Sequence, residues 1–178
     1  MKPSLTIQRI STLLEASPTF LMMVGVPGSG KSTFIQKLIE TSDQSIIIAS
    51  TDDLIEAEAK KQGTTYSEIF GKLNFKQLKA QMNDTIDQAV KSLKHVAHDQ
   101  TNMSKKSRMS KLKNIPETYK KVCLNFTIDD KVLRQRLDER AKRTGKVIPE
   151  FVLKSMFNSY QPPTRDEGFH HIFEIDNS

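Results

Sequence analysis

The sequence predicts an α/β fold in which a parallel β-sheet is covered by helices on both faces. Short apolar runs typical of buried strands alternate along the chain with segments whose apolar residues recur at helical spacing. The first apolar run, at residues 20–26, leads directly into a glycine-rich turn and then into a helical pattern. A length of 178 residues fits one domain, residues 1–178.

Each element has its own signal. Residues 4–16 place Ile7, Ile10 and Leu14 at helical spacing, which predicts an N-terminal helix within an extension formed by residues 1–18. The run at 20–26 is continuously apolar, as in a strand that is buried on both faces. Further strands are expected at residues 45–49, 95–99, 121–127 and 172–175. Further helices are expected after the glycine-rich turn, at 53–61, 75–93, 105–113 and 129–143, and from 149 onward.

Composition excludes several classes of protein. Hydrophobic residues make up 37% of the chain and charged residues 27%, as in a folded domain. The single cysteine, Cys123, excludes an internal disulfide, and no Cys or His cluster has the spacing of a structural metal site. We find no membrane-spanning segment and no signal peptide, so we expect no membrane partner and a cytoplasmic protein of a bacterial or phage-infected host cell. Aromatic residues are few, and no stacking platform for bases is recognisable.

Positive charge is concentrated in one part of the sequence. The formal net charge is +6, but residues 91–146 hold 16 basic and 6 acidic residues, a local net charge of +10. Such a block is typical of a solvated surface, and it also suits an anionic substrate such as a phosphate or a nucleic acid. The motif described next favours the second interpretation.

Residues 25–32 read Gly-Val-Pro-Gly-Ser-Gly-Lys-Ser and fit the phosphate-binding pattern G-x-x-x-x-G-K-[ST] at every fixed position. Glycines let such a loop curl so that backbone N–H groups point at phosphate oxygens, and the following helix N-terminus adds partial positive charge. Lys31 would reach the terminal phosphates and Ser32 would hold Mg²⁺. The sequence therefore predicts ATP and Mg²⁺ as cofactors, bound at Gly25, Pro27, Gly28, Ser29, Gly30, Lys31, Ser32 and Thr33.

Carboxylates follow two of the expected strands. Asp52 and Asp53 come after the strand at 45–49, and Asp99 follows the strand at 95–99, so these side chains should meet at the carboxyl edge of the sheet. A phosphotransferase needs a group that positions and deprotonates an acceptor hydroxyl, and we assign that role to Asp52. Asp99 would face Mg²⁺ through water or the acceptor. Helix capping by Thr51 or Asp52, and a favourable helix-dipole position for Asp53, are the structural alternatives.

Three arginines share one face of the helix expected at 129–143. Arg136, Arg140 and Arg143 are spaced four and three residues apart, so they can form a cationic lid over the nucleotide phosphates, together with the loop that follows. We place this lid at residues 136–148 and count Arg140 and Arg143 with Lys31 and Asp52 as catalytic. A solvated basic face is the alternative interpretation.

The chain resembles the P-loop polynucleotide 5′-hydroxyl kinases, which include a phage enzyme and the kinase domain of an animal end-repair enzyme. The resemblance extends from about Phe20 to the C-terminus and is carried by residues 25–34, Asp52 with Asp53, 99–102 with Arg108, 142–149 and 160–169. It implies a P-loop kinase fold, an acceptor hydroxyl activated by Asp52, phosphate charge neutralised by Lys31 and the lid arginines, and magnesium bound by Ser32. Among the acceptor-side residues it counts Asp53, Asp99, Asn102 and Arg108; a turn-forming role is the alternative for Asn102.

Two departures from the family concern the acceptor. Thr51 and Ile55 stand where the phage enzyme has arginines, so a clamp for the acceptor phosphate is missing or is supplied by other residues such as Arg108, Lys105 or Lys106. The leading hypothesis is a Mg²⁺- and ATP-dependent kinase of DNA or RNA 5′-hydroxyl ends. A kinase acting on a modified DNA base such as hydroxymethyluracil, a nucleoside, a sugar nucleotide or a small molecule is the alternative. A nucleotide-dependent switch without phosphoryl transfer is another.

Overall fold

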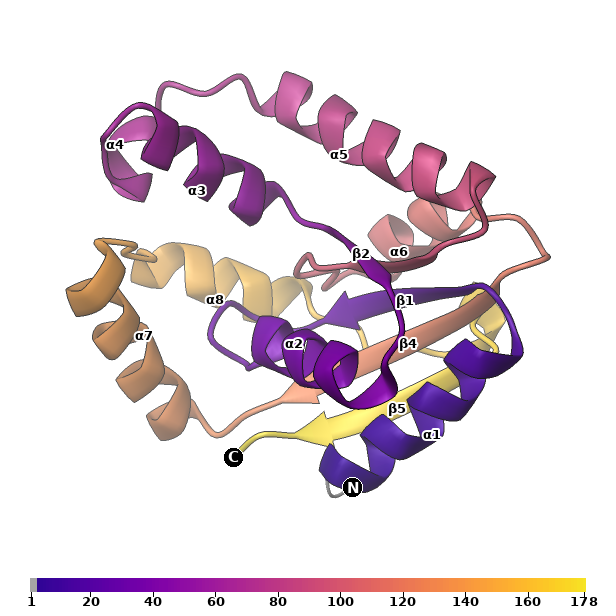
Figure 1. Ribbon diagram of the computed structural model, residues 1–178. Coiled ribbons are helices and arrows are strands. Elements are labelled where there is room, and N and C mark those ends of the chain that lie inside the picture. Colours follow the sequence, from indigo (N-terminus) through magenta and orange to yellow (C-terminus); the bar gives the residue numbers. More distant parts are fainter. Residues whose placement is uncertain (1–2) are drawn as a thin grey trace.

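A single parallel β-sheet organises the chain in the computed structural model, which describes residues 3–178 (Figure 1). Its strands are β1 (Thr19–Val24), β2 (Ile46–Ala49), β3 (His95–His98), β4 (Lys120–Thr127) and β5 (His171–Asp176). They lie in the order β2-β3-β1-β4-β5, and every neighbouring pair is parallel. The predicted fold class and all five predicted strands are confirmed.

Helices cover both faces of the sheet, as predicted. On one face, α1 (Pro3–Ala16) and α2 (Lys31–Ser42) pack against the strands through residues such as Ile10 and Leu38. On the other face, α5 (Phe75–Lys91) and α6 (Lys105–Leu112) contribute Met82, Ile86 and Leu112. Because α1 buries its apolar side in this core, the N-terminal helix predicted from its spacing is part of the fold.

Four further helices lie toward the carboxyl edge of the sheet. They are α3 (Thr51–Lys61), α4 (Tyr66–Phe70), α7 (Asp130–Thr144) and α8 (Glu150–Ser159). Figure 1 shows α4, α7 and α8 beyond the arrowheads of β1, β4 and β5. A small apolar cluster joins α3, α4 and α5 through Ile55, Ile69 and Leu78. Another joins α7 and α8 to the loop after β1 through Leu133, Leu153 and Val26.

Two short elements were not predicted. The helix α4 has five residues and the 3₁₀ turn Arg165–Glu167 has three, which is too short to show a periodic pattern. Each begins with a threonine whose side chain and a glutamate three residues later form a capping box. Within residues 3–178, no helix has the length and apolar character needed to cross a membrane.

Candidate functional site

The glycine-rich loop connects β1 to α2 at the centre of the carboxyl edge. Gly28 and Gly30 have φ angles of 85° and 95°, in the left-handed region that side chains disfavour. A Cβ on Gly30 would also meet the Asn177 side-chain amide. The hydroxyl of Ser29 is buried and has no hydrogen-bond partner in the described structure. The loop therefore has the curled backbone of a phosphate cradle and a polar group available within it.

Lys31 begins α2 and turns back over the loop. Its Nζ donates hydrogen bonds to the carbonyl oxygens of Gly25 at 3.0 Å and Val26 at 2.9 Å. Burial lowers the pKa of Lys31 to about 8, although Asp99 and Asp52 nearby favour the charged form. A buried ammonium whose hydrogen bonds go to neutral carbonyl oxygens is suited to an anionic ligand, because phosphate oxygens would offset the cost of burying its charge.

Ser32 and Asp99 meet across the site. The Ser32 hydroxyl donates a 2.7 Å hydrogen bond to Asp99 Oδ2, and the Asp99 amide donates to the carbonyl oxygen of Ala49, which ties the end of β3 to β2. These two oxygen groups fit Mg²⁺, which takes one or two protein oxygens and completes its shell with phosphates and water. No cluster of three or more His, Cys, Asp or Glu side chains suited to a metal occurs among the described residues.

Asp52 lies in the first turn of α3, where its carboxylate is not used as a helix cap. Ser50 is the N-cap and accepts a hydrogen bond from the Asp53 amide at 3.1 Å, so the alternative interpretation, capping by Thr51 or Asp52, does not hold. The Asp53 side chain is exposed, in the acidic first turn where it favours the helix dipole.

Two side chains hold the Asp52 carboxylate in place. Lys146 Nζ donates to Oδ2 at 2.6 Å and the Tyr66 hydroxyl donates to Oδ1 at 2.7 Å. Burial pushes the pKa of Asp52 upward, but the charge and hydrogen bond of Lys146, the Tyr66 hydrogen bond and Arg140 outweigh it, so the pKa lies below its ordinary value. Asp52 is therefore ionised and oriented at neutral pH.

The predicted lid arginines lie at different distances from the loop. Arg136 donates to the carbonyl oxygen of Asn177, and its guanidinium lies beside Gly30. Arg140 forms a 3.4 Å ion pair with Glu56 of α3, and its charge acts on both Lys31 and Asp52. Arg143 is exposed and makes no ion pair within the described chain. The structure thus brings Arg136 and Arg140 to the site and leaves Arg143 at its rim.

Arg108 is not at the site, contrary to the role implied by the family resemblance. Its side chain is fully buried in α6, and its guanidinium donates two 2.7 Å hydrogen bonds to the Glu167 carboxylate. It also donates to the carbonyl oxygens of Asn102 and Met103. With these partners the guanidinium is satisfied internally and points away from solvent, so it is not available to a substrate.

Asn102 also has a structural role rather than the predicted substrate contact. Its side chain is 3% exposed, its Nδ2 donates to the carbonyl oxygen of Met23 at 2.6 Å, and its Oδ1 accepts from Lys111 at 2.6 Å. The backbone has a φ of 49°, as in the turn-forming alternative. Asn102 therefore fastens the segment after β3 to β1.

Tyr66 is a site residue that the sequence interpretation missed. It lies on the unpredicted helix α4, and its hydroxyl reaches Asp52. The sequence interpretation included Lys146 only as part of the lid. In the structure its Nζ donates a hydrogen bond to Asp52 and lies 3.9 Å from the centre of the Tyr66 ring. The Thr65-x-x-Glu68 capping box was the one sequence signal that could have indicated a helix at Tyr66.

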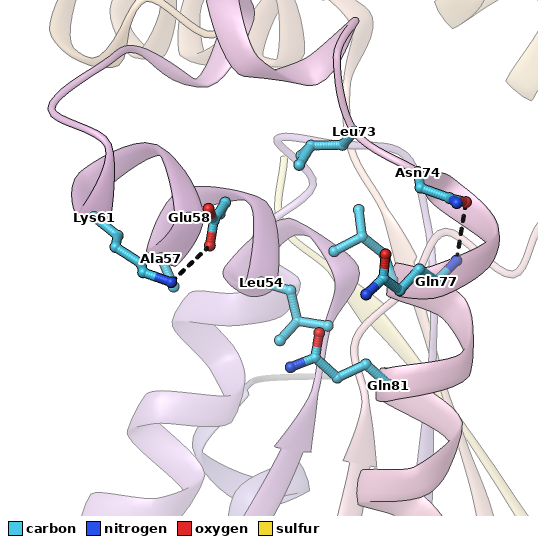
Figure 2. A pocket seen from close by; sticks show the side chains of 9 residues that line it. Leu54, Ala57, Glu58, Lys61, Leu73, Asn74, Gln77 and Gln81 are labelled. Carbon is cyan, nitrogen blue, oxygen red and sulfur yellow. Dashed lines mark hydrogen bonds and ion pairs between the residues drawn. The ribbon is translucent and has the colours of Figure 1, made fainter.

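A separate groove of about 380 Å³ lies between α3 and α5 (Figure 2). Leu54, Leu73 and Leu78 are its apolar lining residues. Glu58 and Lys61 line it from α3, and Gln77 and Gln81 line it from α5. Helical spacing puts Leu54, Glu58 and Lys61 on the side of α3 opposite Asp52. This groove is therefore not part of the phosphate site.

Comparison with known structures agrees with this fold. A chain of the Pnkp1/Rnl/Hen1 RNA repair complex is 26% identical with a TM-score of 0.64, over 80% of this chain and 44% of that one. The protein thus spans less than half of that relative. A putative kinase from Chloroflexus aurantiacus is 14% identical with a TM-score of 0.68, over 90% and 85% of the two chains. A gluconokinase from Sinorhizobium meliloti is 20% identical with a TM-score of 0.53, over 89% and 82%.

The family model described as an AAA domain (AAA_33) matches residues 20–163, well over half of the chain. This match covers the loop, both carboxylate segments and the lid region. Since the sheet, the loop and the structural relatives agree with it, the protein belongs to the AAA domain family and has a P-loop kinase fold.

Proposed function

We propose that the protein is a Mg²⁺-dependent polynucleotide kinase that transfers the γ-phosphate of ATP to the 5′-hydroxyl end of RNA or DNA. The observation that carries the proposal is the Asp52 carboxylate, ionised and held by Lys146 and Tyr66 within electrostatic reach of Lys31. The similarity to a chain of an RNA repair complex supports a nucleic acid acceptor. The local net charge of +10 over residues 91–146 suits the same acceptor.

The chemistry follows from these positions. Phosphoryl transfer has a loose transition state, so the protein contributes mainly positioning and charge. Asp52 would accept the hydrogen bond of the acceptor hydroxyl, orient its oxygen toward the γ-phosphorus and receive its proton as the new P–O bond forms and the bond to ADP breaks. Lys31 and Arg140 would neutralise phosphate charge. Magnesium held at Ser32, and through water at Asp99, would neutralise the remainder.

The experiment measures transfer of labelled γ-phosphate from ATP to a 5′-hydroxyl RNA and to the same RNA with a 5′-phosphate. We expect labelling of the first only, and only with Mg²⁺. Asp52→Asn should reduce transfer at least ~10²-fold while ATP binding stays nearly unchanged, because this group acts on the acceptor rather than on the nucleotide. Asp84→Asn, an exposed carboxylate on α5, is the matched control. Equal transfer by wild type and Asp52→Asn would contradict the assignment.

A second candidate function is a kinase of a smaller or internal hydroxyl. Ile55, where the resembling phage enzyme has an arginine, is buried among Ile69 and Leu78, and Arg108 is buried elsewhere. Neither supplies a clamp for an acceptor phosphate. The labelling experiment therefore includes matching DNA, DNA with hydroxymethylated bases, and a nucleoside panel. Labelling of internal bases or nucleosides alone would favour this second function, and ATP binding without any transfer would favour a switch.

A further inference from the structure

Three aromatic side chains form a continuous row on α4 and the start of α5. The rings of Tyr66 and Phe70 stack with their centroids 5.6 Å apart, and the rings of Phe70 and Phe75 meet edge to face at 4.8 Å. We call these three residues the aromatic row. No such platform was recognised in the sequence, because residues 66, 70 and 75 become neighbours only when α4 folds against the start of α5.

The outer part of the aromatic row is open to solvent. Phe70 is 44% exposed and Phe75 is 47% exposed. Adjacent rings that remain this accessible gain little of the stabilisation that burial gives to apolar side chains. Core packing in this region is provided instead by Ile69 and Leu78, which are buried. Nearly half of the surface of each phenylalanine therefore remains available to a ligand.

The inner end of the aromatic row is at the proposed catalytic carboxylate. The Tyr66 hydroxyl donates to Asp52 Oδ1, and Lys146 of the lid lies over the Tyr66 ring. Phe70 is in contact with the same ring, and Phe75 follows. A nucleic acid strand whose 5′-hydroxyl lay at Asp52 would find exposed ring surface one and two ring spacings beyond Tyr66, at Phe70 and Phe75.

The charge around the aromatic row matches a nucleic acid. Residues 60–79 hold five lysines and one glutamate. That glutamate, Glu68, accepts hydrogen bonds from Thr64 and Thr65, which occupy its carboxylate. Lys72 and Lys76, next to the two phenylalanines in sequence, form no ion pair with any described residue. Exposed rings bordered by lysines suit a polyanion with flat apolar bases.

We propose that Phe70 and Phe75 form the stacking surface for the nucleobases that follow the 5′-terminal nucleotide of a single-stranded acceptor. This inference rests on the proposed function and adds to it the part of the acceptor that is recognised. Every base has a π-face, so the surface accepts any sequence and contributes affinity without sequence specificity. The 5′-terminal nucleotide itself would still bind at Asp52, and the aromatic row would contact only the nucleotides that follow it.

The first test compares acceptors with and without bases at the second and third nucleotides. Phe70→Leu and Phe75→Leu keep apolar volume but lose the ring, and each should raise the KM for a 5′-hydroxyl oligonucleotide about tenfold. With abasic second and third nucleotides, wild type and both variants should share the same raised KM, because ring and base act as one pair. Phe157→Leu, an equally exposed phenylalanine on α8, is the control and should leave every KM unchanged.

A second measurement reports stacking without catalysis. The chain contains no tryptophan, so Phe75→Trp places a unique fluorophore in the aromatic row. Binding of the oligonucleotide should quench its emission, and the abasic oligonucleotide should not. The control is the variant Phe157→Trp, which places the fluorophore on α8 instead. This readout does not depend on phosphoryl transfer.

The outcomes distinguish the two proposals. Transfer to the oligonucleotide with unchanged KM in both leucine variants and no quenching would overturn the stacking surface and leave the polynucleotide kinase standing. Quenching without transfer to any oligonucleotide would overturn the kinase proposal and leave the surface as a binding site. Equal quenching by normal and abasic strands would also overturn stacking, since contact with the backbone would explain it.

Discussion

Arg108 shows how far a single residue can be interpreted from sequence. The resemblance to polynucleotide kinases groups Arg108 with the segment after β3 as an acceptor-side residue, and in the structure its guanidinium donates to the carbonyl oxygens of Asn102 and Met103 in that segment. The direction in which the Arg108 guanidinium points depends on its hydrogen bond to Glu167, which lies 59 residues later in the chain. A guanidinium has five donors, and here carbonyl and carboxylate oxygens take up its capacity. No local pattern in the sequence indicates that pairing.

The Arg108–Glu167 pair predicts a large difference in stability between neighbouring acidic residues. Both side chains of the pair are 0% exposed, so Glu167→Gln leaves a buried charge without its counter-charge and should lower the free energy of unfolding by about 3–5 kcal/mol. Asp166 pairs with Lys105 at the surface, and Asp166→Asn should cost less than ~1 kcal/mol. Urea denaturation measures both. Similar losses in the two variants would show that burial does not determine the effect.

At the scale of elements, long periodic segments could be predicted from sequence and short ones could not. The five strands and seven of the helices were expected within a few residues of their observed bounds, because their segments are long enough to carry a strand or helix pattern, whereas α4 has only five residues. Helix α4 has one buried apolar residue, Ile69, which packs on Ile55 and Leu78. Tertiary packing thus stabilises this helix, and Tyr66, the partner of Asp52, was missed with it.

The candidate site was predictable where it depends on strand ends. Parallel strands place their carboxyl ends at one edge, so the meeting of Ser32 with Asp99 and the nearness of Asp52 to Lys31 follow from the topology. The contact of Lys146 with Asp52 spans 94 residues and depends on how α7 ends at Gly145, which has a φ of 69°. Such a contact between two surface segments has no signature in the sequence.

The lid region, residues 136–148, contacts α3 and α4 through few side chains. We therefore predict that removing one of these contacts changes its dynamics. Lys146 contacts Asp52 and Tyr66, and Ser67 donates to the Gly145 carbonyl oxygen. Lys146→Met removes the ion pairs of Lys146 with Asp52 and Glu56 and should speed amide hydrogen exchange in residues 140–149 and in α4, leaving the sheet unchanged. Lys142→Met, an exposed change at the end of α7 just before this loop, is the control. Identical exchange in wild type and Lys146→Met would show that other contacts hold the lid.

At the scale of the whole molecule, the order of the strands joins the site to the core. β3 lies between β1 and β2, so the segment carrying Asp99 lies between the glycine-rich loop and Asp52. Alternate side chains of β1 and β4 enter the two apolar cores on opposite faces of the sheet. A ligand that contacts the ends of β1, β2 and β3 would therefore stabilise the central sheet as a unit.

Cys123 offers a direct measurement of this coupling. It is the single cysteine, it lies on β4 with 0% exposure, and burial raises the pKa of its thiol, so we expect a thiol reagent to react only when the sheet opens. ATP that binds only the folded protein should slow labelling by a factor of 1 + [ATP]/Kd, about 100-fold at 100 Kd. Lys31→Met should lose this protection because its phosphate contact is gone. Labelling of wild type that ATP leaves unchanged, or equal protection of Lys31→Met, would show that nucleotide binding is not linked to the sheet through the loop.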